Sequence, residues 1–109
     1  LYGAHHDIGL VRQRDEKLLA WDVVGPVCES GDFLGLAREL PELDPGALLA
    51  VFSAGAYGAV LGSSYNTRPA APEVLVDGAT HDVVRRRPSY ADMLAGEKIP
   101  DWLNSQDGQ

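Results

Sequence analysis

One segment of the sequence sets a thiol beside carboxylates, between glycines that favour an exposed loop: GPVCESGD, residues 25–32. A cysteine can give a proton to carbon or nitrogen as an acid, or attack as a nucleophile once deprotonated. Cys28 is the chain's single cysteine, and a lone cysteine is more often a small buried hydrophobe. Glu29 and Asp32 could equally serve turn hydrogen bonds. The residue types alone leave both interpretations of this loop open.

A second segment surrounds one tyrosine with small residues, directly after the apolar run at residues 48–52: SAGAYG, residues 53–58. Small residues let a ligand or a backbone approach closely, and the backbone N–H groups at a turn between a strand and a helix suit a phosphate. Tyr57 could therefore aim its phenol at a bound group. The alternative is a tyrosine packed at the end of a strand.

The histidines and the basic run carry weaker signals. Cys28 with His5, His6 or His81 matches no common zinc spacing, so we predict no metal site. We expect His5 and His6 to decorate the surface or a strand edge. The run Arg85-Arg86-Arg87 is typical of a solvated or ion-paired strand edge.

The elements that position these residues are short. Apolar runs between glycines and prolines predict strands at residues 8–11, 18–24, 48–52, 73–76 and 80–86. Asp77-Gly78 between the last two runs predicts a tight hairpin. Short helices are expected at residues 35–40 and after Ser89, while residues 57–64 fit helix or strand. Together these elements predict a mainly β domain, either a barrel or a sandwich, with short helices.

Composition bounds the class of protein. The chain has 109 residues and 11.7 kDa, which is one domain's worth. Nine Lys and Arg residues against sixteen Asp and Glu residues give a net charge of −7. A chain this acidic is a poor candidate for binding the negatively charged backbone of nucleic acid. Apolar runs are too short for a membrane span, and residues 1–4 show no signal-peptide pattern, so we expect a cytoplasmic protein. Leu1 and the single Met93 suggest a piece of a larger protein.

Several strings, taken in order, resemble the C-terminal part of the diaminopimelate decarboxylase family, a group of fold-type III decarboxylases. They are LYGAHH at 1–6, GPVCESGD at 25–32, AGAYG at 54–58, YNTRP at 65–69, EVLVDG at 73–78 and RRR at 85–87. The resemblance covers residues 1–103. It implies that these residues form a C-terminal β-barrel domain like that of alanine racemase, followed by a polar tail at residues 104–109.

The resemblance also implies a cofactor, a partner and an activity. Pyridoxal 5'-phosphate would be held through a lysine Schiff base in an N-terminal (β/α)₈ barrel that lies outside this chain. The sheet domain would complete the active site across a head-to-tail homodimer. The implied reaction converts meso-2,6-diaminopimelate, a small amino-acid substrate, to L-lysine and CO₂. Since Lys17 and Lys98 match no cofactor-binding segment, the isolated piece should be inactive.

Site residues follow from the resemblance position by position. Cys28 matches the proton donor to the α-carbon, and Glu29 matches the acid that binds the distal amino group. Tyr57 matches a tyrosine near the cofactor phosphate that also contacts substrate, and Tyr2 matches a substrate-binding tyrosine. His5 departs from the family's usual tyrosine. Neighbouring Glu29 and Asp32 should keep the Cys28 thiol protonated.

Two alternatives stay open. The first is a related fold-type III decarboxylase that acts on another basic amino acid. The second is a non-catalytic domain that only mediates dimerisation, in which Cys28 would be buried and Tyr57 packed.

Overall fold

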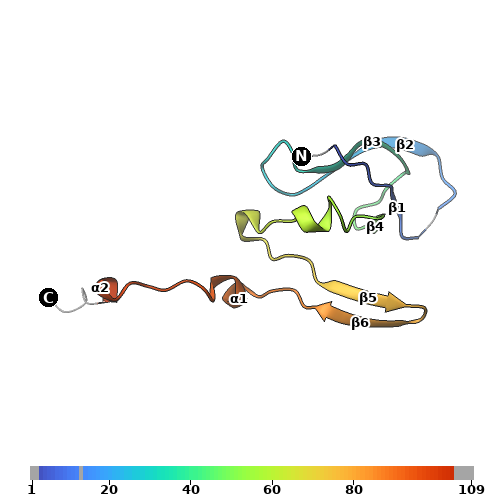
Figure 1. Ribbon diagram of the computed structural model, residues 1–109. Coiled ribbons are helices and arrows are strands. Elements are labelled where there is room, and N and C mark those ends of the chain that lie inside the picture. The colour runs from blue at the N-terminus through green and yellow to red at the C-terminus, as the bar shows by residue number, and fades with distance from the viewer. Residues whose placement is uncertain (1–2, 13, 105–109) are drawn as a thin grey trace. The chain divides into compact units, whose positions relative to one another are not determined.

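The computed structural model describes residues 3–12 and 14–104 (Figure 1), so Tyr2 lies outside the described residues. Backbone contacts divide the chain into two compact units, residues 1–62 and 63–109, and each is described by itself. Over the described residues as a whole, more residues lie in strands than in the short helices, which confirms the mainly β class. No helix among the described residues has the length and apolar character needed to cross a bilayer.

The first unit holds two antiparallel strand pairs. Its strands are β1 (Ile8–Leu10), β2 (Leu18–Val24), β3 (Phe33–Pro41) and β4 (Leu49–Val51), followed by a 3₁₀ helix, Ala59–Leu61. β1 pairs with β4, so that Ile8 lies opposite Val51. β2 pairs with β3, and the connection between them is the loop that carries Cys28.

The predicted helix at residues 35–40 is wrong, because these residues lie inside β3. Leu40 lies opposite Leu19 of β2 and is 3% exposed, the only buried large apolar side chain among the described residues. Pairing with the preceding strand β2 overrides the weak helical preference of this segment. A bulge in the pairing places Ala37 at φ 50°, where its N–H donates to Asp22 Oδ1 at 2.8 Å.

Many large apolar side chains stay exposed. In the run at residues 48–52, predicted as a strand, Leu48 is 70% and Phe52 is 52% exposed, and only residues 49–51 form β4. Exposed apolar side chains also line the later hairpin: Val74, Leu75, Val76, Val83 and Val84. Apolar surface on this scale is typical of protein that contacts further protein.

The second unit begins with a 3₁₀ helix, Tyr65–Thr67, and contains a hairpin of β5 (Glu73–Asp77) and β6 (Thr80–Arg85). The hairpin is confirmed, with its turn shifted by one residue. Asp77 still pairs with Thr80, so the two turn residues are Gly78 and Ala79. Gly78 takes φ 57° at the first turn position, which fits a type II′ turn.

Two short helices follow the hairpin: α1 (Tyr90–Leu94) and α2 (Asp101–Asn104). The predicted cap before α1 is confirmed as a capping box. Asp92 N–H donates to Ser89 Oγ at 3.2 Å, and Ser89 N–H donates to Asp92 Oδ2 at 2.6 Å. These bonds satisfy N–H groups that the short helix leaves without partners.

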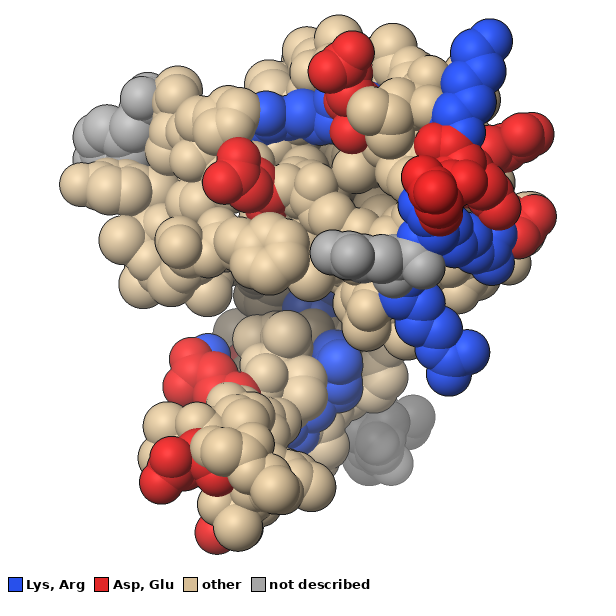
Figure 2. Space-filling model, turned by 90° about the vertical axis from the view of Figure 1, so that its right-hand side faces the viewer, with Lys and Arg blue, Asp and Glu red and all other residues tan. Residues whose placement is uncertain are grey.

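The basic run is ion-paired, as predicted. Arg85 pairs with Glu73 across the hairpin, and Arg86 donates to both oxygens of Asp92 at 2.6 and 2.7 Å. Arg87 donates to the Pro69 carbonyl at 3.4 Å. Elsewhere too, on the face drawn in Figure 2, Lys and Arg side chains lie against Asp and Glu side chains.

Replacing Asp92 with asparagine should lower the Tm at pH 7 by about 3 °C, the usual effect of losing part of a helix cap. Hydrogen bonds from Arg86 and Ser89 hold the pKa of Asp92 well below its ordinary value. A lowered pKa stabilises the folded state above the unfolded pKa of about 4, and this contribution is lost as pH falls through the folded pKa. The Tm difference should therefore shrink below pH 4 in thermal unfolding scans.

The matched control for this prediction is Asp82→Asn, in exposed β6, which should shift the Tm little. A difference between Asp92→Asn and the parent that grows as pH falls would contradict the argument.

Candidate functional site

The loop between β2 and β3 presents Cys28 to solvent. Gly25 N–H donates to the Asp32 carbonyl at 2.7 Å, and Asp32 N–H donates to the Glu29 carbonyl at 3.1 Å. These bonds fold the loop back on itself, with Cys28 exposed between them. The interpretation of Cys28 as a small buried hydrophobe is therefore wrong for this structure, and the thiol is accessible to a reacting group.

Both carboxylates of this loop accept backbone hydrogen bonds. Asp32 Oδ2 accepts from Val27 N–H at 2.9 Å. Glu29 Oε2 accepts from Gly31 N–H, and Oε1 lies 3.5 Å from the Ser30 hydroxyl that donates to it. The turn hydrogen bonds that the sequence left open are thus present at both positions. The Glu29 carboxylate is nevertheless exposed and close to Cys28 in the chain.

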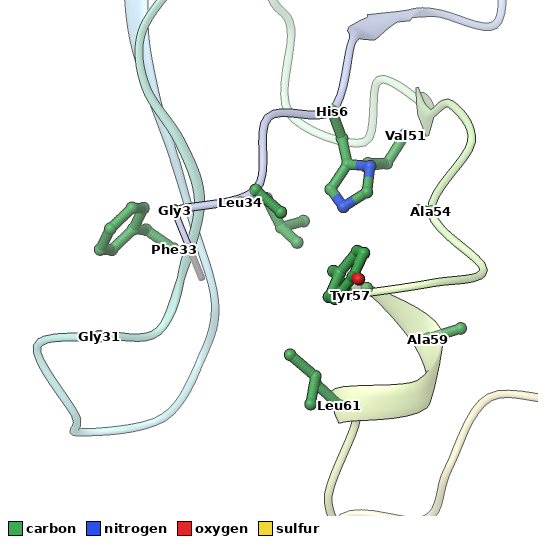
Figure 3. Close-up of a pocket in the computed structure, with 12 residues that line it drawn as sticks. Gly3, His6, Gly31, Phe33, Leu34, Val51, Ala54, Tyr57, Ala59 and Leu61 are labelled. Atoms are coloured by element: carbon green, nitrogen blue, oxygen red, sulfur yellow. The ribbon is translucent and has the colours of Figure 1, made fainter. Parts of the chain in front are cut away.

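Tyr57 lies in a cavity of about 360 Å³ in the first unit. The lining residues are Gly3, Ala4, His6, Gly31, Phe33, Leu34, Val51, Ala54, Tyr57, Gly58, Ala59 and Leu61. In Figure 3 the rings of His6 and Tyr57 lie one above the other, opposite the Leu34 side chain. Gly31 brings the Cys28 loop to the same cavity, whereas Cys28 and Glu29 are not among its lining residues.

The turn after β4 aims Tyr57 into this cavity. Ser53 and Tyr57 take φ values of 50° and 61°, in the left-handed region that side chains other than glycine rarely adopt. Ala59 N–H closes the turn by donating to the Ala54 carbonyl at 2.6 Å. Backbone strain of this kind gathers at functional sites, because the surrounding structure must hold it in place. The alternative of a packed tyrosine fits less well, since Tyr57 is 55% exposed.

His6 is the cavity residue that sequence reasoning missed. The prediction of surface decoration fits exposed His5, whose Nε2 lies 3.4 Å from Asp7 Oδ1. It is wrong for His6, which is half-buried and whose Nε2 has no partner among the described residues.

Residues 1–55 match the family model described as the C-terminal sheet domain of pyridoxal-dependent decarboxylases. The chain belongs to this decarboxylase family. Its sheet-domain relatives include a diaminopimelate decarboxylase of Pseudomonas fluorescens, 54% identical over 99 residues, which are 91% of this chain and 24% of that protein. Another, of Archaeoglobus fulgidus, is 46% identical over 104 residues, 94% of this chain and 25% of that protein.

A decarboxylase structure of the same kind shares the fold. The crystal structure of diaminopimelate decarboxylase from M. jannaschii in co-complex with L-lysine superposes with a TM-score of 0.83 at 34% identity. The match covers 94% of this chain and 23% of that one. The chain therefore spans about a quarter of the length of the decarboxylases it matches.

The residues around the cavity fit one end of the family's cofactor. Ala54, Gly58 and Ala59 leave room beside the Tyr57 phenol, which can donate a hydrogen bond to a phosphate. The chain's lysines lie elsewhere: Lys98 Nζ pairs with Asp101 Oδ1 at 3.3 Å in the second unit, and Lys17 is exposed before β2. The cavity can thus contact a pyridoxal group, but its described wall offers no lysine to bind one covalently.

Proposed function

We propose that the intact protein is a diaminopimelate decarboxylase, which converts meso-2,6-diaminopimelate to L-lysine and CO₂. This chain is then its C-terminal sheet domain, and an N-terminal (β/α)₈ barrel holds pyridoxal 5'-phosphate. The observation that carries the proposal is the exposed Cys28–Glu29 pair, on a tight loop whose Gly31 reaches the cavity of Tyr57. Relatives about half identical over nearly the whole chain, which carry this enzyme's name, support the substrate.

Pyridoxal phosphate, when bound, supplies the electron sink for loss of the carboxylate. The residues of this chain would then orient the substrate and control its protonation. Tyr57 donates its hydroxyl proton in a hydrogen bond to the cofactor phosphate and contacts the substrate. Cys28 Sγ holds a proton and delivers it to the α-carbon that has lost CO₂, which makes Cys28 the general acid.

Glu29 gives the site its preference for a diamino acid. Its exposed carboxylate is a charge-assisted acceptor for the substrate's distal ammonium group. To bind that group with Oε2, the carboxylate must exchange the hydrogen bond from Gly31 N–H for one from the ammonium. Tyr2 is proposed as a further substrate contact.

The proposed assembly is a cytoplasmic homodimer in which this domain completes the partner's active site. The exposed apolar side chains of the first unit, such as Phe33 at 47% and Leu34 at 51%, support contact with further protein. The net charge of −7 argues against nucleic acid as a partner.

Substrate competition with the intact protein tests the proposal. We expect CO₂ release from meso-2,6-diaminopimelate, with L-lysine as product, and weak competition by ornithine or arginine. Faster turnover of another basic amino acid would favour the related decarboxylase. No CO₂ from any amino acid, together with a normal dimer, would favour the dimerisation domain.

The isolated chain of 109 residues should neither bind pyridoxal phosphate covalently nor release CO₂. The reason is that neither Lys17 nor Lys98 is among the residues that line the cavity. The measurements are the absorbance spectrum of the chain mixed with pyridoxal phosphate and CO₂ release from meso-2,6-diaminopimelate. A new absorbance band that survives gel filtration would contradict this prediction.

A further inference from the structure

Asp32 closes the loop that carries Cys28 and Glu29, and the proposed function gives it no contact with substrate or cofactor. Its Oδ2 accepts from Val27 N–H at 2.9 Å, across the four residues that lie between the two positions. Its side chain is half-buried, whereas Cys28 and Glu29 are exposed. The hydrogen bond holds the Pro26–Val27 peptide group, one residue before Cys28, and so restrains the backbone from which the thiol projects.

Gly25 and Asp32 fit each other at the two ends of this loop. A Cβ built on Gly25 would lie 2.1 Å from both carboxylate oxygens of Asp32, which is far inside van der Waals contact. The carboxylate thus fills the space that a side chain at position 25 would occupy. Gly25 N–H also donates to the Asp32 carbonyl at 2.7 Å. A glycine is required here for close approach, and its partner in that approach is Asp32.

The carboxylates of Glu29 and Asp32 accept hydrogen bonds from different parts of the loop. Glu29 contacts Ser30 and Gly31, one and two residues away, and can leave them without opening the loop. The Asp32 carboxylate joins the loop's two sides, so without it only backbone hydrogen bonds hold the segment from Gly25 to Gly31. Reacting groups must be held within a few tenths of an ångström, and a misplacement of about 1 Å can cost 100-fold in rate.

We propose that Asp32 is a positioning residue, whose carboxylate holds the Cys28–Glu29 loop in the one conformation that presents thiol and acid together. The inference rests on the proposed function for its kinetic consequence. Its structural consequence, a fixed environment for the Cys28 thiol, stands without it.

The test compares Asp32→Ala, Asp32→Asn and a control in the intact protein. Asp32→Ala removes the acceptor for Val27 N–H, and kcat for meso-2,6-diaminopimelate should fall by about 10- to 100-fold. Asp32→Asn keeps an acceptor oxygen in place, so it should retain most of the activity. The matched control is Asp22→Ala, which removes a carboxylate that accepts Ala37 N–H at 2.8 Å in the same hairpin, outside the Cys28 loop. Its kcat should stay near that of the parent.

A second measurement does not depend on decarboxylation. The rate at which iodoacetamide alkylates Cys28, followed by mass spectrometry of its peptide, should change in Asp32→Ala and stay constant in Asp22→Ala. Gly25→Ala should change the rate in the parent, because the new methyl group displaces the Asp32 carboxylate. It should add little in the Asp32→Ala background, where that carboxylate is gone. If Asp32→Ala does not fold, Gly25→Ala alone serves as the variant that displaces the carboxylate.

The outcomes separate the two proposals. If the parent protein releases no CO₂, the proposed function fails, and the alkylation rates still decide the role of Asp32. Equal alkylation rates in the parent, Asp32→Ala and Asp22→Ala would overturn the positioning role. So would additive effects of the Gly25 and Asp32 substitutions, or an Asp32→Asn variant as impaired as Asp32→Ala.

Discussion

Replacing Cys28 with serine or alanine in the intact enzyme should lower the rate of L-lysine formation by about 100- to 10,000-fold, the usual contribution of a positioned general acid. A serine hydroxyl occupies nearly the same space as the thiol but is a far weaker acid, and alanine has no proton to give. The exposure of Cys28 on its loop leaves the sulfur accessible to substrate. The measurement is L-lysine and CO₂ release, quantified separately under saturating substrate and cofactor.

Separate quantification matters because cleavage and protonation are different steps. If protonation of the α-carbon becomes slow, part of the decarboxylated substrate can take its proton at another atom, so the yield of L-lysine per CO₂ should also fall in Cys28→Ala. Ser30→Ala is the matched control from the same loop, since within the described part of the chain its hydroxyl makes only the 3.5 Å hydrogen bond to Glu29. Unchanged lysine yield and turnover in Cys28→Ala would remove the donor role from Cys28.

Local signals predicted most of the elements. The apolar runs that became β1, β2 and β4 are bounded by turn residues, and the hairpin of β5 and β6 has a glycine where its turn needs positive φ. The helix cap at Ser89 could be predicted from the sequence, because the two residues of a capping box lie three positions apart. Each of these features depends on contacts between near neighbours in the sequence.

Features set by distant contacts were not predictable in the same way. β3 is a strand because it pairs with β2, although residues 35–40 favour a helix when taken alone. Leu40 is buried by that pairing, while the apolar run at 48–52 stays partly exposed because the described residues do not cover it. The burial of a strand depends on the residues that pack against it, and the sequence of the strand alone does not identify those residues.

In the candidate site too, features set by local sequence could be predicted and features set by distant contacts could not. Glycines on both sides of Cys28 pointed to an exposed loop, and the structure has one. Gly31 of this loop and His6 line the same cavity as Tyr57. This arrangement depends on the pairing of four strands, so no local sequence pattern predicts it. The chemical roles of Cys28, Glu29 and Tyr57 came from family resemblance and stay predictions until kinetics tests them.

Replacing Glu29 with glutamine should reduce kcat/KM for meso-2,6-diaminopimelate by about 10- to 150-fold. A hydrogen bond to a charged group contributes about 1.5–3 kcal/mol, and glutamine offers the distal ammonium a neutral acceptor instead of a carboxylate. Glutamine keeps the shape of the side chain and an oxygen for Gly31 N–H, so the loop should hold its conformation. The measurement is kcat/KM for meso-2,6-diaminopimelate and for 2-aminopimelate, which lacks the distal amino group.

The comparison of the two substrates decides what Glu29 does. If its carboxylate binds the distal ammonium, Glu29→Gln should lose activity only toward meso-2,6-diaminopimelate and should treat 2-aminopimelate as the parent does. Glu39→Gln, an exposed glutamate of β3, is the matched control for loss of one negative charge and should leave both values unchanged. An equal loss toward both substrates would mean that Glu29 supports the loop through Gly31 rather than recognising the amino group. The preference for a diamino acid would then have to come from residues outside this loop.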